Sequence, residues 1–444
     1  MKKTVFITLV TLLIMGLSAA EVLSLDSALK MAIANNNELK AAENNMKAAE
    51  KSMQSSYLAL GPSASLSGSK VYLDPGSETP AGTIDETSSY GISASQPIFN
   101  GGKVLLSAQI AKNTYKLQKT SYQSKLLEIT GAVEQKYYSV QGLKEQMKAL
   151  EKKLEQSTTN LEIAKAKLEA GLFSNAEYLQ MRSEKLSSEL DLMNVQNAYL
   201  LGKLELSNYL GYTESYDVDE FDMSSYQIIM EIIKQSAAAA QKNLEDQLIE
   251  IGKEHNPTIA ISRLSIDTAT KSKTLAAGNF LPSINLSYSY DWSNSNLNKD
   301  FDGSGSLALV ASMPIFPLAD NALDYQSAHY QLKRSENNYA STEDGIILAI
   351  RSSYLNLITS ARQVESASVS NELAWETWNQ MRESFEQGLI SSTDLLSTEV
   401  MVINSDYNYI SARQGFLESI SSLKNLLGMD DKEQLIKLIE NMEE

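Results

Sequence analysis

Few residues in this sequence have the chemistry needed for catalysis or metal binding. The 444 residues include no cysteine and two histidines, His255 and His329, which lie far apart with no ligand pattern around either. Nucleophilic and metal-dependent enzymes need such groups in clusters, and the serine-rich stretches lack the nucleophile elbow of hydrolases. The sequence therefore predicts a protein that is not an enzyme and has no cofactor or metal site. We expect both histidines to be solvated helix residues.

The most informative charged groups are two acids that end matching motifs. Glu177 ends a Gly-x-x-Ser-x-x-acid motif that begins at Gly171, and Asp394 ends the same motif from Gly388. Glycine can end an incoming helix in a left-handed conformation, and Ser-x-x-Glu/Asp is a capping pattern for the next helix. Two interpretations stay open: the acids only cap these helices, which contributes about 1 kcal/mol for a cap, or they also favour cations in an opening that they line.

Long helices must position these turns. Residues 103–170 contain no proline, and their apolar side chains, from Val133 and Tyr137 to Leu168, recur at alternating steps of three and four. Such a period places one apolar stripe along a helix and makes neighbouring helices coil around each other. The helix would be roughly 100 Å long, and it is too polar to lie in lipid. Each turn therefore joins two antiparallel helices into a long coiled-coil hairpin.

The whole arrangement occurs twice. An offset of 217 residues carries 94–99 onto 311–316, Tyr137 onto Tyr354, and the first turn, 171–177, onto the second, 388–394. We divide the chain into a first repeat over 21–211, an acidic connection over 212–230, a second repeat over 231–428 and a C-terminal tail over 429–444. The acidic stretch 212–222 is interpreted as a solvated connection.

Each repeat also contains a predicted β-hairpin, at 62–99 and 282–316. Apolar residues alternate there with polar, mostly serine, residues, strictly so over 283–292, as in strands with one apolar face. Alternating segments of about ten residues with interfacial aromatics are typical of transmembrane β-strands; the other interpretation is a soluble sandwich. Four strands cannot close a barrel, so several copies must assemble, with 8, 12 or 16 strands. The aromatic residues expected to face the membrane are Tyr72, Tyr90, Tyr288, Tyr290 and Trp292.

The N-terminal segment and the charge indicate export. Residues 1–20 have Lys2 and Lys3, an apolar run and small residues before Glu21, which predicts a cleavable signal peptide. No cysteine follows that could be acylated, so we expect no lipid anchor. The net charge of −17 excludes nonspecific nucleic-acid binding, because neutralising phosphates requires a basic surface.

These features together resemble the TolC family of outer-membrane efflux proteins. The resemblance covers residues 22–428. It depends on the opening helix with Leu25, Ala28 and Leu29, on the stretch Gln-Pro-Ile-Phe-Asn-Gly-Gly at 96–102, and on the duplicated turns. It implies a mainly α-helical homotrimer. Each chain would give four strands to a 12-stranded outer-membrane β-barrel and its helical hairpins to an α-barrel tunnel through the periplasm.

The resemblance also implies partners and a gate. A periplasmic adaptor and an inner-membrane transporter would engage the turns, and Glu177 and Asp394 would lie near the constricted mouth. Phe385 and Ile390 are apolar where polar links between neighbouring coils would latch a closed tip, and Pro317-Leu318-Ala319 replaces the first repeat's Asn-Gly-Gly. The residues expected to contact the adaptor are Gly171, Leu172, Phe173, Ser174, Gly388, Leu389, Ile390 and Ser391.

The predicted function is a passive outer-membrane exit duct of a tripartite efflux or type I secretion system, gated at the helical tip. The alternative is a periplasmic coiled-coil adaptor or scaffold without a pore. The tyrosine-faced hairpins favour the duct, because a scaffold would need the helices alone. The sequence does not name the cargo.

Overall fold

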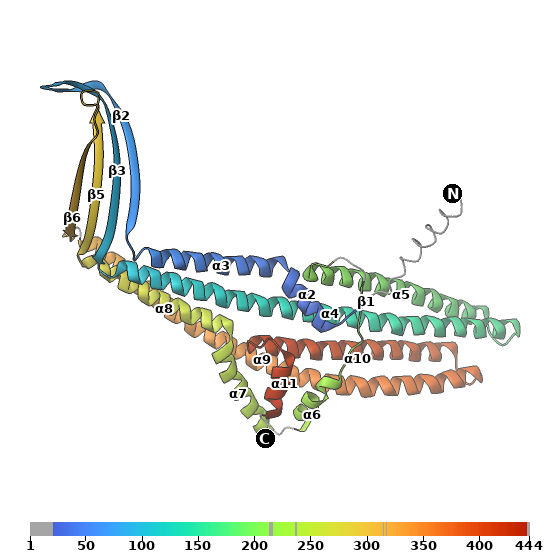
Figure 1. Cartoon of the computed structure of the whole chain (residues 1–444). Coiled ribbons are helices and arrows are strands. Elements are labelled where there is room, and N and C mark those ends of the chain that lie inside the picture. Colours follow the sequence, from blue (N-terminus) through green and yellow to red (C-terminus); the bar gives the residue numbers. More distant parts are fainter. Residues whose placement is uncertain (1–20, 213–215, 236–237, 314, 317, 442–444) are drawn as a thin grey trace, which may run out of the picture. The chain divides into compact units, whose positions relative to one another are not determined.

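The helices and strands follow the duplicated pattern along the chain (Figure 1). The computed structural model describes residues 21–212, 216–235, 238–313, 315–316 and 318–441, so the predicted signal peptide at 1–20 lies outside the described residues. In chain order the elements are β1 (Glu21–Leu23), α2 (Leu25–Asn35), α3 (Asn37–Leu58), β2 (Ser63–Thr79), β3 (Gly82–Asn100), α4 (Lys103–Glu169), α5 (Asn175–Leu210), β4 (Tyr216–Val218), η2 (Ser224–Tyr226), α6 (Gln227–Gln235), α7 (Ala238–His255), α8 (Pro257–Ala277), η3 (Gly278–Phe280), β5 (Ser283–Ser295), β6 (Asp302–Ser312), α9 (Leu318–Glu386), α10 (Ser392–Leu426) and α11 (Lys432–Asn441).

The chain folds into two compact units, and neither unit coincides with a sequence repeat. The first comprises Met1–Ala41, Gln123–Asn256 and Asp344–Glu444; the second comprises Ala42–Tyr122 and Pro257–Glu343. Each unit therefore takes corresponding parts from both repeats.

The second unit contains one antiparallel sheet with strand order β2-β3-β5-β6. The register places Tyr90 opposite Trp292 and Ala94 opposite Tyr288, so the aromatic side chains share one face. On the other face the serines bond across the strands, as in Ser65 Oγ to Ser93 Oγ at 2.7 Å. β2 and β6 are the outer strands. Among the described residues, no helix combines the length and apolar character that a membrane span requires.

The apolar residues that recur at steps of three and four form a buried stripe along both long helices. Val133 and Tyr137 of α4 are buried in the first unit, as are Ile350 and Tyr354 of α9. Trp378, further along α9, is buried in a second cluster near the turns, as the coiled-coil interpretation requires. The structure thus confirms a mainly α-helical fold built on long helical hairpins.

One asparagine in each repeat fixes where the returning helix ends. Asn36, between α2 and α3, donates a hydrogen bond from Nδ2 to the carbonyl of Tyr209 at 3.4 Å. Asn256, between α7 and α8, donates to the carbonyl of Leu426 at 2.8 Å. The carbonyls at a helix C-terminus lack partners within the helix. These amides therefore supply partners to equivalent carbonyls in the two repeats.

The interpretation of 212–222 as a solvated connection is wrong for its central part. β4 pairs in parallel with β1, and the side chains of Tyr216 and Val218 are buried in the core of the first unit. The alternation of apolar and charged residues over Tyr216–Val218 allows a strand to bury one side and expose the other. The segment 429–444 is likewise more than a tail, because α11 buries Leu435 and Ile439 in the same core.

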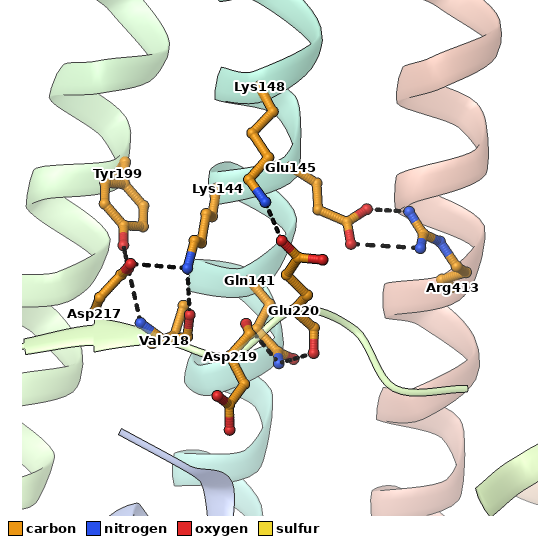
Figure 2. A network of polar contacts seen from close by, with 10 residues as sticks. All are labelled: Gln141, Lys144, Glu145, Lys148, Tyr199, Asp217, Val218, Asp219, Glu220 and Arg413. Atoms are coloured by element: carbon orange, nitrogen blue, oxygen red, sulfur yellow. Dashed lines mark hydrogen bonds and ion pairs between the residues drawn. The ribbon is translucent and has the colours of Figure 1, made fainter. Parts of the chain in front are cut away.

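Two acids of the segment 216–222, Asp217 and Glu220, form ion pairs with lysines of α4, although Glu220 remains exposed to solvent (Figure 2). Lys144 Nζ lies 2.9 Å from Asp217 Oδ2 and also donates to the carbonyl of Val218. Lys148 pairs with Glu220. Burial alone would raise the pKa of Asp217, but hydrogen bonds from Lys144 and Tyr199 outweigh it and leave that pKa below its usual value.

A buried ion pair connects the two repeats inside the first unit. Glu134 of α4 accepts hydrogen bonds from Lys424 and Ser421 of α10, and all three side chains are buried. A buried charge without its partner is strongly unfavourable, whereas replacing both members with apolar residues is often neutral.

We expect Lys424→Met to lower the free energy of unfolding by about 3–5 kcal/mol, because it leaves Glu134 buried without a cation. The double variant Glu134→Met/Lys424→Met should recover most of that loss. Urea unfolding of the purified protein, followed by far-UV circular dichroism, measures both. A single variant as stable as the original protein would contradict this account.

Candidate functional site

Both predicted turns end their incoming helix with a left-handed glycine. Gly171 has φ 74° and Gly388 has φ 76°, a region that costs a side-chain-bearing residue energy. The next amide in each turn reaches back five residues: Leu172 N donates to Lys167 O and Leu389 N to Ser384 O, both at 2.9 Å. This pattern closes the last carbonyls of the helix and reverses the chain. The two turns lie at the same end of the hairpins in the first unit (Figure 1).

Each turn then starts the returning helix with a complete capping box. Glu177 accepts from the amide of Ser174 at 2.8 Å, and its own amide donates to Ser174 Oγ at 3.2 Å. Asp394 and Ser391 repeat this arrangement, with both bonds at 3.2 Å. The capping interpretation of the two acids is therefore confirmed. Whether they also set ion preference remains a prediction.

The same bonds keep the two acids charged. The backbone amide of Ser174, and then its hydroxyl, lower the pKa of Glu177. The hydroxyl of Ser391, and then its amide, lower that of Asp394. Both carboxylates are therefore ionised at neutral pH, and Asp394 is exposed. Together they carry fixed negative charge at the tip of each chain.

The eight turn residues divide into exposed and packed ones. Leu172 is 76% exposed and Leu389 is 72% exposed. Phe173 and Ile390 instead pack against the cluster of buried residues below the turns. The tip thus presents two leucines to the solvent, and their contact with an adaptor stays a prediction.

Lys167 holds the two turns together, a role that the sequence analysis did not find. Its Nζ donates to the carbonyl of Phe385 at 2.7 Å and lies 4.3 Å from the centroid of the Phe385 ring and 5.4 Å from that of Phe173. The two rings meet edge to face, with centroids 5.9 Å apart. A cation at the C-terminus of a helix is favourable, and contact with an aromatic face adds to this. The two turns are thus joined by a lysine and two aromatic rings, and not by the polar links considered in the sequence analysis.

The aromatic residues predicted to face the membrane lie together on one face of the sheet. Tyr72, Tyr90 and Tyr288 are exposed, and Tyr290 and Trp292 are half-buried against each other with ring centroids 4.5 Å apart. The face is not wholly apolar, because Lys70 and Glu86 form an ion pair at 2.8 Å next to Tyr72.

Comparison with known families identifies the chain. The family model described as outer membrane efflux protein matches residues 28–212 and 248–429, which is most of both repeats. The chain belongs to the outer membrane efflux protein family. Its members are outer-membrane channels and not enzymes, which agrees with the scarcity of catalytic groups and places the chain in the outer membrane with a periplasmic extension. No curated protein matches the sequence.

Solved structures show the same fold at low sequence identity. CusC, whose crystal structures describe folding and transmembrane channel formation, has a TM-score of 0.80 at 17% identity, over 91% of this chain and 92% of that chain. The CmeC outer membrane channel of Campylobacter jejuni has a TM-score of 0.75 at 18% identity, over 94% and 89%. VceC, an outer membrane protein of Vibrio cholerae, has a TM-score of 0.75 at 14% identity, over 91% and 96%. The architecture of this outer membrane efflux protein is thus shared with these proteins.

We expect Lys167→Met to loosen the contact between the turns by about 1 kcal/mol, because it removes the hydrogen bond and the cation–ring contact. That change corresponds to about a fivefold larger open population, which the rate of chymotrypsin cleavage at the turns follows when opening is fast. Lys165→Met, on an exposed position of the same helix, is the matched control. Equal cleavage rates in the two variants would show that Lys167 does not hold the turns.

Proposed function

We propose that three copies of this chain form the exit duct of a tripartite efflux or type I secretion system. In this proposal the signal peptide is removed on export, and the twelve strands close a barrel in the outer membrane. The helical hairpins surround a periplasmic tunnel whose tip meets an adaptor and an inner-membrane transporter. The duct conducts passively and opens when its partners favour the dilated tip. The observation that carries the proposal is the apolar, tyrosine-rich sheet face in a chain with long polar helical hairpins.

The sheet supports assembly because its strand directions allow a closed ring. β2, β3, β5 and β6 alternate in direction, so β6 of one copy would run antiparallel to β2 of the next. An open edge in lipid leaves backbone groups without partners, which costs several kcal/mol per group. Closure between copies satisfies every edge, and three copies supply twelve strands.

The helices supply a second complementary surface. Along α5 five apolar side chains, each more than half exposed, recur at steps of three, four and seven: Leu186, Leu190, Met193, Leu200 and Leu204. In the part of α9 that belongs to the first unit, residues 344–386, the exposed large apolar side chains are Leu348, Leu355, Val369 and Leu373. Helical spacing places each stripe on the side away from the buried residues of its own helix. Exposed apolar stripes with a 3.5-residue period require a partner helix.

Both stripes are apolar, and they lie at similar distances along the helices from the turns. Leu190 lies about as far from the turn that precedes α5 as Leu373 lies from the turn that follows α9. The same holds for Met193 and Val369. Copies related by rotation about one axis bring equal heights together. We therefore infer that α5 of one copy packs against α9 of the next, which closes a ring.

A charge in this stripe should prevent assembly. We expect Leu190→Glu to shift the purified protein from trimer to monomer, because the carboxylate would be buried without a partner. Ser187→Glu adds a charge at an exposed position of α5 that points about 100° away from the stripe around the helix, and it should leave the trimer intact. Light scattering after size-exclusion chromatography measures the mass. Trimers of Leu190→Glu as stable as those of the control would refute this interface.

The acids at the turns give the duct its proposed ion preference. Three copies would bring three Asp394 and three Glu177 carboxylates to the mouth, and rings of acids favour cations. Single-channel current across a planar bilayer under a potassium chloride gradient should show a cation-selective reversal potential. The change Asp394→Asn with Glu177→Gln should reduce that selectivity.

Glu151→Gln, an exposed acid of α4 away from the turns, is the control for this experiment. Equal permeability ratios in all three proteins would refute the role of the acids. If folded protein gave no current even with both acids replaced, the scaffold alternative would be favoured over the duct.

A further inference from the structure

A buried carboxyl group lies where the four helices near the turns meet. Glu399 of α10 is 4% exposed. Its Oε1 accepts a hydrogen bond of 2.5 Å from Asn160 Nδ2 of α4. Within the described part of the chain, its Oε2 is buried and accepts no hydrogen bond of ordinary geometry. Trp378 of α9 and Met181 of α5 belong to the same buried cluster.

The surrounding charges do not compensate an ionised Glu399. Glu184 of α5 adds a second negative charge. Lys153 of α4 is the nearby cation, but it pairs with Glu184 at 3.1 Å and with Asp191 at 3.4 Å. Arg382 of α9 lies over the ring of Trp378 at 5.2 Å and 3.5 Å from Glu386. Lys153 and Arg382 are therefore both engaged by other groups.

Burial, and then the charge of Glu184, raise the pKa of Glu399 to about 7. Lys153 and the hydrogen bond from Asn160 act in the opposite direction. The indole of Trp378 also favours the ionised form, but no hydrogen bond of ordinary geometry joins its Nε1 to Oε2. Loss of water around the carboxyl group is the dominant cause.

The first repeat shows that the hairpin does not need this carboxyl group. The offset of 217 residues places Arg182 at the position of Glu399 and Leu161 at that of Trp378. Arg182 is exposed and Glu399 is buried. Of the two equivalent positions, only that of Glu399 therefore places a carboxyl group in the cluster.

We propose that Glu399 is a pH-sensitive latch of the tip: when protonated it lies in the four-helix junction, and when ionised it draws water in and loosens the helices. The consequence for gating rests on the proposed duct function, but the loosening itself does not. The relevant second state is a loosened junction in which Glu399 is hydrated and titrates like an ordinary glutamate.

The pH dependence of closure follows from the difference in proton affinity of Glu399 between the two states. The closed junction binds the proton more tightly than the loosened one, so closure is favoured at acidic pH and weakens as the pH rises from about 4.5 through 7. With these two values, the ratio of loosened to closed junctions rises by up to about 70-fold per chain between pH 5 and pH 8. Above pH 8 it changes little.

Hydrogen exchange of the purified full chain tests the latch directly. Amides in the helix segments around 154–166 and 392–405 should exchange faster at pH 8 than at pH 5.5, after correction for the intrinsic rates. Glu399→Gln, which is neutral and of the same size, should abolish this difference. Glu376→Gln removes an exposed carboxylate of α9 and should retain it.

A second variant keeps the test valid if Glu399→Gln does not fold. Glu184→Gln removes the repelling charge and frees Lys153, so the midpoint of the change should move to lower pH. Corrected exchange that is equal at both pH values in the original protein, or an unchanged midpoint in Glu184→Gln, would overturn the proposal.

Channel current distinguishes the latch from the duct. If exchange changes with pH as expected and the open probability follows it, both proposals are supported. If exchange changes but no current is observed at any pH, even with Asp394 and Glu177 replaced, the latch stands and the duct function fails. If current is observed and exchange is independent of pH, the duct stands and the latch fails.

Discussion

The unpaired outer edges of the four-stranded sheet are the constraint on which the rest of this structure depends. β2 and β6 each carry a row of backbone donors and acceptors on their outer side, and the face of the sheet carries tyrosines suited to a membrane interface. One chain cannot satisfy both conditions in lipid. Closure with further copies can, because the alternation of strand directions continues across the joint. The exposed apolar stripes of α5 and α9 fit the same solution.

Within one chain, a set of contacts between the repeats keeps the two helical hairpins together. The buried pair of Glu134 and Lys424 joins α4 to α10 in the core, and Lys167 joins α4 to the end of α9 at the turns. These contacts differ in strength: the first is buried and costly to break, whereas the second is at the accessible tip. A tip that opens needs weaker contacts than the core that holds it.

Local patterns in the sequence predicted most of the fold, and contacts between distant residues account for what they missed. The three-four rhythm and the period of two identified the long helices and the strands, because each depends on one face of one element. The capping boxes followed from Ser174 and Ser391. The burial of Tyr216 depends on pairing with β1, and the role of Lys167 depends on a carbonyl more than two hundred residues away. The sequence did carry one signal for the buried carboxyl group. Glu399 lies between Leu395 and Val402 at a position of the three-four pattern where an apolar residue is expected.

The most direct test of the central claim is an electron cryo-microscopy map of the purified mature protein in a lipid nanodisc. The account predicts three copies, with β6 of each next to β2 of the following one in a closed barrel of twelve strands, and with α5 packed against α9 across each joint. A monomer whose sheet edges stay open, or are covered by another part of the same chain, would contradict it.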